Sequence, residues 1–299
     1  ATEALAAALL ALIEPGDEVV IFEPAYDAYR PLIARAGGTV RAVRLTLPEG
    51  RIDRAVLAEA ISPRTRVLLL NDPLNPLGTR LPEDDLAHLA AVCTAHDLVA
   101  VCDEVWEALV YDRAQHRSLM DFPGMRERSV KIGSAGKIFG LTGWKVGWMC
   151  AAAPLTRVLA RAHQFLTFTT PPNLQWALAE GLAREDAFVA EARAQHQTAR
   201  DHFAAGLAGL GLVTLPAAAT YFLSVDLAAS GVPMSDRAFC DALVERAGVA
   251  AIPVSAFYGS QGPAHLVRFC FAKDIAVLDA ALAMLNQARD RGVWGEQHR

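Results

Sequence analysis

The chain has 299 residues, of which 53% are hydrophobic and 20% charged, and its formal net charge is −5. This balance supplies a sizeable apolar core and excludes a disordered chain. No basic stripe is present, so nucleic acid is not an expected partner. No apolar run reaches the length of about 18 residues that a membrane span needs, so none is predicted.

Cysteine is sparse and odd in number, and no two cysteines form a C-x-x-C pair. The five are Cys93, Cys102, Cys150, Cys240 and Cys270. At least three lie inside apolar runs, where a buried free thiol is the common state. We expect a reducing, cytoplasmic setting rather than a disulfide framework, and no metal site is predicted.

Strand-like and helix-like segments alternate through the first half of the chain. Helical patterns occupy residues 4–13, with Thr2 as a plausible cap, and residues 26–36, 55–60 and 83–96. Short apolar runs predict strands at residues 19–22, 40–45, 67–70, 98–102, 130–133 and 146–150. This alternation predicts an α/β fold, a three-layer sandwich in which helices cover both faces of a mainly parallel sheet.

The pattern changes in the second half. Residues 155–210 are expected to be largely helical, with one break at Pro171 and Pro172. Beyond them, strands are predicted at 220–225, 249–253 and 266–271, and helices at 236–247 and 275–287. We therefore expect a large domain at 1–185, then a linking helix and a smaller α+β C-terminal domain at 186–299. The polar tail after Arg289 is expected to be loose.

Polar residues follow three of the predicted strands at the point where each strand ends. They are Asn71, Asp72 and Asn75 after one strand, Asp103 and Glu104 after the next, and Ser134 and Lys137 after a third. In an open parallel sheet, ligands bind beyond the carboxyl ends of the strands. We expect a ligand site at that edge.

Each side chain there also has an ordinary explanation. A lysine such as Lys137 can form a Schiff base with a carbonyl compound, although a lysine at a loop start is more often a surface charge. Asp103 can pair with a protonated pyridine nitrogen or cap a helix. Asn75 can bind a ring hydroxyl or serve a turn.

Other residues offer contacts for an anion or a ring. Ser134, Lys145 and the helix N-terminus at Thr2 suit a phosphate group. Tyr26 can stack on an aromatic ring, although aromatic residues are more often part of the core. Arg268 places a charge inside an apolar strand, where a guanidinium suits a carboxylate or an internal ion pair.

Taken together, these residues resemble the fold-type-I, class I/II aminotransferases that depend on pyridoxal phosphate (PLP), and within them the kynurenine, glutamine and methionine aminotransferase subgroup. The resemblance runs from Ala1 to about Gln287. It is carried by ATEAL (1–5), EPAYDAY (23–29), NDPLNPLG (71–78), CDEVWE (102–107), SAGKIFGLTGWKVGW (134–148), HQFLTF (163–168), TYFLSVD (220–226) and VRFCFAKD (267–274). The block at 134–148 is the most specific.

The resemblance implies a role for each matching residue. Lys137 holds the cofactor and moves the proton during the reaction. The other cofactor contacts are Asp103 at the pyridine nitrogen, Asn75 and Trp106 near the ring oxygen, Tyr26 on the ring, and Ser134, Lys145, Ala1 and Thr2 at the phosphate. Arg268, assisted by Asn71, binds the substrate carboxylate, and Phe168 reaches the site of the neighbouring subunit in a homodimer. The implied reaction moves an amino group from an α-amino acid to a 2-oxo acid, and aromatic residues hint at a large neutral amino donor.

The chain departs from the family pattern at several positions. Trp106 stands where a tyrosine is usual, Asp72 replaces a neutral residue, and Ala219 replaces a glycine. The family usually has roughly eighty to a hundred residues before the position of Ala1, so we expect an N-terminally incomplete chain.

Three alternatives remain at this level. A PLP-dependent β-lyase of the cysteine-conjugate type can use the same residues, since function belongs to the site rather than to the fold. A non-enzymatic effector-binding domain behind a DNA-binding head is a second alternative, and a non-functional fragment is a third.

Overall fold

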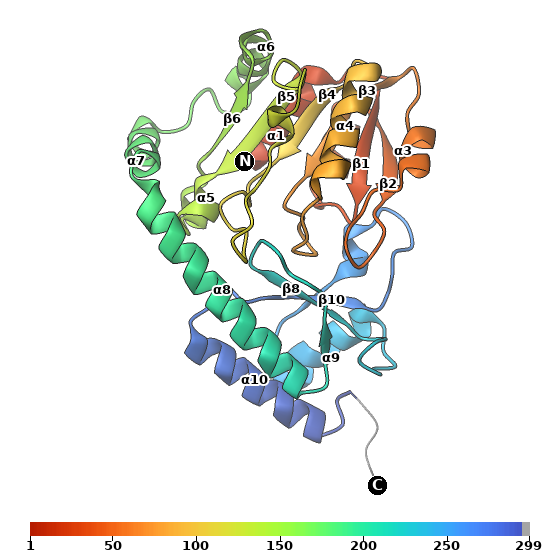
Figure 1. The fold of residues 1–299 in the computed structure, drawn as a ribbon, viewed down its shortest axis with the longest axis vertical. Helices are drawn as coiled ribbons and strands as arrows, with labels where there is room; N and C mark the ends of the chain where they lie inside the picture. Colours follow the sequence, from red (N-terminus) through yellow and green to blue (C-terminus); the bar gives the residue numbers. More distant parts are fainter. Residues whose placement is uncertain (295–299) are drawn as a thin grey trace.

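The computed structural model describes residues 1–294, apart from the side chains of residues 185 and 186. The described residues form a six-stranded sheet in the order β2-β1-β3-β4-β5-β6 and a four-stranded sheet in the order β7-β8-β10-β9. Figure 1 shows the larger sheet with its helices in the upper part of the molecule and the smaller sheet below it. The predicted α/β class is confirmed.

The strands of the large sheet lie close to the predicted apolar runs. They are β1 (Glu18–Glu23), β2 (Thr39–Arg44), β3 (Thr65–Asn71), β4 (Val99–Asp103), β5 (Ser129–Ser134) and β6 (Gly147–Ala151). Neighbouring strands pair in parallel, except β5 and β6, which are antiparallel. A parallel partner needs a long crossover, and only α5 (Ala135–Ile138) and η2 (Thr142–Trp144) separate these two strands. The sheet is therefore mainly parallel, with one reversed strand at its edge.

Helices cover both faces of this sheet because successive residues of a strand point to opposite faces. Val19 and Ile21 of β1 pack in the core beneath α1, α2 and α6, whereas Val20 and Phe22 pack beneath α3 and α4. These helices are α1 (Thr2–Leu12), α2 (Tyr29–Arg35), α3 (Arg54–Ala60), α4 (Glu83–Ala95) and α6 (Ala153–Gln164). The predicted three-layer sandwich is confirmed.

Two helix starts differ from the prediction. The first helix has Ala1 as its N-cap, and Thr2 is its first helical residue, so Thr2 is not the cap. The second helix begins at Tyr29 instead of Tyr26, because residues 26–28 form a turn in which the Tyr29 N–H donates to the Tyr26 carbonyl at 3.1 Å. That turn leaves the Tyr26 side chain outside the helix, at the edge of a cavity.

The remaining elements form the link and the smaller unit. They are α7 (Pro172–Leu182), α8 (Glu185–Gly209), β7 (Val213–Thr214), β8 (Phe222–Asp226), α9 (Asp236–Ala247), β9 (Ile252–Pro253), β10 (Leu266–Cys270) and α10 (Ile275–Asp290), with the 3-10 helices η1 (Leu119–Asp121) and η3 (Val254–Phe257). The predicted break at Pro171 and Pro172 is confirmed by the start of α7. The two-residue strand β7 is too short for a sequence pattern to predict.

Residues 293 and 294, which belong to the tail expected to be loose, are packed. Val293 and Trp294 are buried in the core of the small unit, and the Trp294 ring meets Phe239 edge-on at 5.4 Å between centroids. The expectation was therefore wrong for these residues, because one large aromatic side chain anchors an otherwise polar segment. Residues 295–299, which belong to the predicted domain 186–299, lie outside the described residues. The domain boundary at 185 stays a prediction.

Two further observations concern the whole described chain. No helix within residues 1–294 has both the length and the apolar character needed to cross a membrane. All five cysteines are free: Cys93, Cys102 and Cys240 are buried, and Cys150 and Cys270 are exposed.

Candidate active site

A cavity of about 540 Å³ lies beyond the carboxyl ends of β3, β4 and β5, where η3 and the strands of the small sheet approach the large sheet. Eleven of the twelve predicted site residues line it. They are Ala1, Thr2, Tyr26, Asn71, Asn75, Asp103, Trp106, Ser134, Lys137, Lys145 and Arg268. Phe168 does not line this cavity and is largely exposed after α6.

Lys137 enters this cavity from the short helix α5, directly after β5. Its Nζ donates to the Tyr221 hydroxyl at 2.8 Å and lies 4.7 Å from the centre of the Trp106 ring. The helix fits here because residue 136 is glycine: a Cβ at that position would lie 2.9 Å from Thr142 Cα. The amine is thus placed by close backbone packing and surrounded by aromatic rings.

Asp103 ends β4 and is buried. Its Oδ2 accepts from the Tyr29 hydroxyl at 2.5 Å, while Oδ1 has no hydrogen-bond partner among the described residues. Burial raises the pKa of the Asp103 carboxyl, and the hydrogen bond from Tyr29 opposes that shift. A buried oxygen without a donor is costly to a folded protein, so this carboxylate is suited to a ligand that brings an N–H.

Asn71 and Asn75 link the strand ends to the small unit. The Asn71 amide donates to the Asp103 carbonyl at 2.8 Å, and its oxygen accepts from the Asn75 backbone N–H at 3.0 Å. The Asn75 oxygen in turn accepts from Arg268 Nη1 at 2.6 Å. Asn71 therefore holds backbone groups in place, and its predicted contact with substrate stays a prediction.

Arg268 lies on β10 and packs against aromatic rings. Its guanidinium stacks 3.9 Å from the Phe222 ring centre and 5.0 Å from that of Phe257. Burial lowers the pKa of this guanidinium, and no carboxylate within the described part of the chain forms an ion pair with it. The sequence allowed either an internal ion pair or a carboxylate ligand for Arg268. The internal ion pair is not found among the described residues, so Arg268 is available to an anionic ligand.

Three further groups that line the cavity suit a small anion: Ser134, Lys145 and the N-terminus of α1. Ser134 is buried at the end of β5, and Lys145 has a left-handed backbone (φ 57°) just before β6. The N-terminus of α1 lies close by, since a Cβ at Gly147 would fall 2.5 Å from the Ala1 nitrogen. No side chain in the described part of the chain caps that helix, so its first N–H groups are available to a phosphate.

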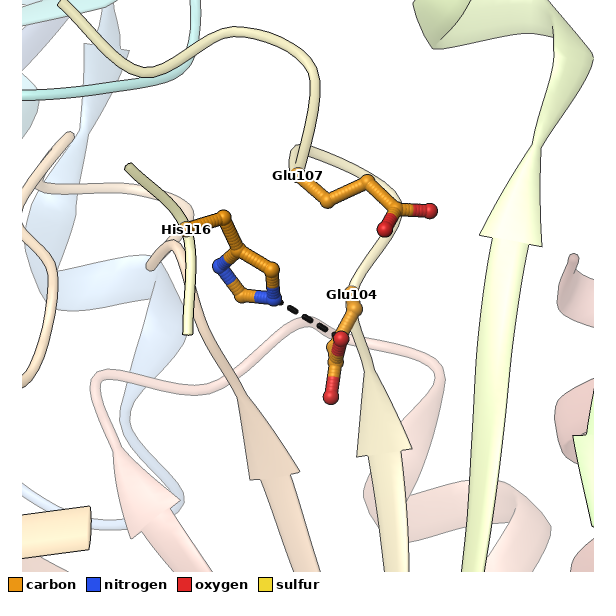
Figure 2. Close-up of side chains that lie close together, drawn as sticks. All are labelled: Glu104, Glu107 and His116. Atoms are coloured by element: carbon orange, nitrogen blue, oxygen red, sulfur yellow. Dashed lines mark hydrogen bonds and ion pairs between the residues drawn. The ribbon is translucent and has the colours of Figure 1, made fainter. Parts of the chain in front are cut away.

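A buried polar cluster supports β4 from behind Asp103. Glu104 accepts from Ser118 at 2.7 Å and meets His116 Nε2 at 2.8 Å, and Figure 2 shows the imidazole pointing at this carboxylate with Glu107 nearby. The ligand atoms of Glu104, Glu107 and His116 lie within 4.8 Å of one another. Lys131 already provides a cation, 3.5 Å from Glu104 and hydrogen-bonded to Glu107. The cluster is therefore read as an internal ion-pair network.

Several contacts in and around the cavity were not predicted. Tyr29 and Tyr221 lie within the quoted segments EPAYDAY and TYFLSVD, but nothing in the sequence shows which acid or amine their hydroxyls meet. Phe257 and His116 lie in segments without a recognisable pattern. A buried tyrosine hydroxyl needs a partner, and that requirement is the only sequence signal that could have singled out the two tyrosines.

Comparison with known proteins agrees with this geometry. The family model described as aminotransferase class I and II matches residues 1–285. The probable N-succinyldiaminopimelate aminotransferase DapC of Mycobacterium tuberculosis is 44% identical over 97% of this chain and 76% of its own length. The chain belongs to the class I and II aminotransferase family. The methionine aminotransferase of Escherichia coli is 40% identical over 96% of this aminotransferase and 74% of its own length.

Solved structures show the same relationship in three dimensions. The M. tuberculosis N-succinyldiaminopimelate aminotransferase superposes with a TM-score of 0.92 over 96% of this chain and 75% of that one. The E. coli methionine aminotransferase also gives 0.92, at 40% identity, over the same shares of the two chains. This aminotransferase moves an amino group between an amino acid and a 2-oxo acid, and its family implies PLP as the cofactor.

Proposed function

We propose that this aminotransferase binds PLP in the cavity beyond β3, β4 and β5 and holds it covalently through Lys137. The observation that carries the proposal is the free Oδ1 of buried Asp103, which lines the same cavity as the Lys137 amine. A protonated pyridine nitrogen is the N–H that this oxygen lacks. The donor set fits the rest of the group, with Ser134, Lys145 and the α1 amides at the phosphate and Asn75 near the ring oxygen.

The residues divide the work of amino transfer between them. Bound PLP supplies an aldehyde that takes up the amino group and a pyridinium ring that draws electrons from the reacting carbon. Asp103 keeps the ring nitrogen protonated, Lys137 moves the proton, and Arg268 holds the substrate carboxylate. With the carboxylate fixed, the bond to be broken can be oriented relative to the ring. Tyr26, which lines the cavity, would stack on the ring, and Trp106 lies against Lys137 from within the core.

We also propose that the amino donor carries a large, neutral side chain. Support comes from the apolar lining beside Arg268, which includes Phe222, Ile252 and Phe257 as well as Tyr26. In a comparison of methionine, phenylalanine and aspartate as donors, aspartate should be the poorest. A preference for aspartate would contradict this assignment.

A homodimer is part of the proposal, because large apolar side chains are exposed together on the segment from α6 to α8. Phe165 is 84% exposed, Phe168 76% and Trp176 74%. Exposed apolar patches of this kind mark interaction sites. We propose a second copy of the chain on this surface, with Phe168 directed to its site, in a reducing cytoplasmic compartment that suits the five free cysteines.

Lys137 can be tested directly, because the chain has four lysines: Lys131, Lys137, Lys145 and Lys273. The protein is incubated with PLP and reduced with borohydride, and the modified peptide is mapped by mass spectrometry. The label is expected on Lys137 and is expected to disappear in Lys137→Ala, while Lys273→Ala serves as the matched control. A label on any other lysine would overturn the assignment.

A further inference from the structure

The Lys137 amine makes one hydrogen bond among the described residues, and its partner is Tyr221. Its hydroxyl lies 2.8 Å from Lys137 Nζ, and no other hydrogen-bond partner of that amine is found among the described residues. Trp106 packs edge-on against the Tyr221 ring, with 4.5 Å between centroids. Because indole has no hydrogen-bond acceptor, Trp106 can offer its ring face to the ammonium group but cannot take over the contact.

The backbone that carries Tyr221 is strained. Thr220 is fully buried and has a φ of 65°, in the left-handed region that β-branched residues rarely adopt. Three hydrogen bonds hold it there: its N–H donates to the Leu109 carbonyl at 2.9 Å, its carbonyl accepts from the Tyr111 hydroxyl, and its Oγ1 accepts from the Phe222 N–H at 3.1 Å.

The residues before Thr220 are tied to the large domain as well. The Ala219 N–H donates to the Gly78 carbonyl at 2.8 Å, and the Tyr111 N–H donates to the Ala218 carbonyl at 2.9 Å. Ala219 also forms an isolated bridge with Val110. The segment that leads into β8 is therefore hydrogen-bonded to the loops that follow β3 and β4 of the large sheet. Strained residues persist where their surroundings over-determine them, and they gather at functional sites.

We propose that Tyr221 is a positioning residue for Lys137, a role that rests on the function proposed above. Amino transfer would require the Lys137 amine, when it is not bound to the cofactor, to stay close to the reacting carbon so that it can move the proton. The Tyr221 hydroxyl holds the free amine there by one hydrogen bond. The strained, anchored backbone at Thr220 fixes the direction of that hydroxyl.

The test begins with the cofactor-free protein, so that it does not depend on turnover. Wild type and Tyr221→Phe are labelled briefly with acetic anhydride, and the label on each lysine is measured by mass spectrometry. Loss of one hydrogen bond to the amine should raise the labelling rate of Lys137 about fivefold relative to Lys145, with Lys131 unchanged. Tyr258→Phe, which removes a phenol hydroxyl outside the cavity, is the matched control and should leave the ratio as in wild type.

Tyr111→Phe provides a second variant that keeps the Tyr221 side chain. It removes the hydroxyl that holds the Thr220 carbonyl, so the Lys137 labelling ratio should rise, but by less than in Tyr221→Phe. Equal Lys137 labelling in wild type and both variants, each shown to be folded by circular dichroism, would overturn the proposal.

With PLP added, the proposal predicts that the substitution lowers kcat and leaves KM nearly unchanged. Tyr221→Phe should still carry the borohydride label on Lys137, with kcat lowered about tenfold or more and the KM for the amino donor within about twofold of wild type. Unchanged kcat with the label on Lys137 would contradict the role of Tyr221 alone. If PLP and borohydride fail to label Lys137 in wild type, the proposed function is contradicted. The acetylation ratio still tests the hydrogen bond between Tyr221 and Lys137.

Discussion

Asp103 is an example of a ligand-binding residue that lowers the stability of the folded protein. Its carboxylate is buried, one of its oxygens has no donor within residues 1–294, and burial raises its pKa. Each of these features lowers the stability of the folded protein as long as no ligand N–H donates to the free oxygen. The same side chain should therefore weaken the empty protein and strengthen cofactor binding.

Asp103→Asn separates these two effects. Removing the buried charge should raise the free energy of unfolding of the cofactor-free protein by about 1 kcal/mol at pH 7.5, as measured by urea denaturation. Loss of the charge-assisted hydrogen bond should weaken PLP binding about 10- to 100-fold in an absorbance titration. A variant that binds PLP as tightly as wild type would remove Asp103 from the cofactor site.

Arg268 supports a second prediction at the scale of one side chain. Arg268→Ala should raise the KM for both the amino acid and the 2-oxo acid, because one guanidinium binds the carboxylate of each. Loss of such a pair is worth about 2–5 kcal/mol, or at least about thirtyfold in KM. Arg44→Ala, which removes an exposed arginine beside Tyr258, is the control. An unchanged KM for both substrates would rule out this role.

At the scale of elements, helix ends follow local rules. Helix α4 ends at Ala95, and the chain leaves it through Asp97, whose φ of 52° lies in the left-handed region. The Leu98 N–H returns to the Cys93 carbonyl at 2.9 Å, a closing bond that usually accompanies glycine or asparagine at this position. Asp97 is 95% exposed and pairs with Arg128 at 2.9 Å.

Asp97→Gly should therefore stabilise the protein by about 0.5 kcal/mol. Glycine relieves the left-handed strain, and the exposed ion pair that is lost contributes little. Asp97→Ala loses the same ion pair without that relief, so it should be less stable than Asp97→Gly by about 1 kcal/mol. Thermal denaturation of the two variants measures the difference, and equal midpoints would contradict the argument.

The elements also show what sequence can and cannot predict. Apolar runs located β1 to β6 and the polar residues at their ends, because both patterns are local. The reversed direction of β6 follows from the short link between it and β5, and the anchoring of Trp294 depends on Phe239 far away in the chain. The hydroxyl contacts of Tyr29 and Tyr221 span 74 and 84 residues. No single-sequence pattern reports such separations.

At the scale of the whole molecule, one buried acid should shape the dependence of stability on pH. Burial raises the pKa of Asp72 to about 6, against about 3.9 in an unfolded chain. Below about pH 4 the carboxyl is protonated in both states. As the pH rises to about 6 the unfolded state ionises first, so the free energy of unfolding falls by about 2 to 3 kcal/mol.

Asp72→Asn should remove that loss. The stability difference between Asp72→Asn and wild type should grow from pH 4 to pH 7, as measured by urea denaturation across that range. Asp112→Asn is a control of opposite sign: the hydrogen bond from Arg200 lowers the pKa of Asp112, so its stabilising effect is lost as the pH falls. A constant difference for Asp72→Asn across the range would contradict the raised pKa.

The exposed apolar segment from α6 to α8 supports a prediction about assembly. Trp176→Glu should shift a dimer towards monomer in analytical ultracentrifugation, because it places a charge on an apolar surface. Val244→Glu, which also introduces a charge at an exposed apolar residue, but on α9, should leave the assembly unchanged. A wild-type protein that sediments as a monomer at all concentrations would contradict the proposed homodimer.

The long helix α8 connects the two sheets, and Figure 1 shows it running down one side of the molecule to α10. Its 25 residues span about 37 Å. Because the helix is this long, a tilt of about 5° at its first turn displaces its last turn by about 3 Å. Arg268 lies on β10 opposite Ser224 of β8, and Tyr221 directly precedes β8, with its carbonyl accepting from the Phe271 N–H at 3.0 Å. A small rotation of this helix would therefore shift Arg268 and Tyr221 together, while the hydrogen bonds of Ala219 and Thr220 to the large sheet's loops would resist that shift beside Lys137.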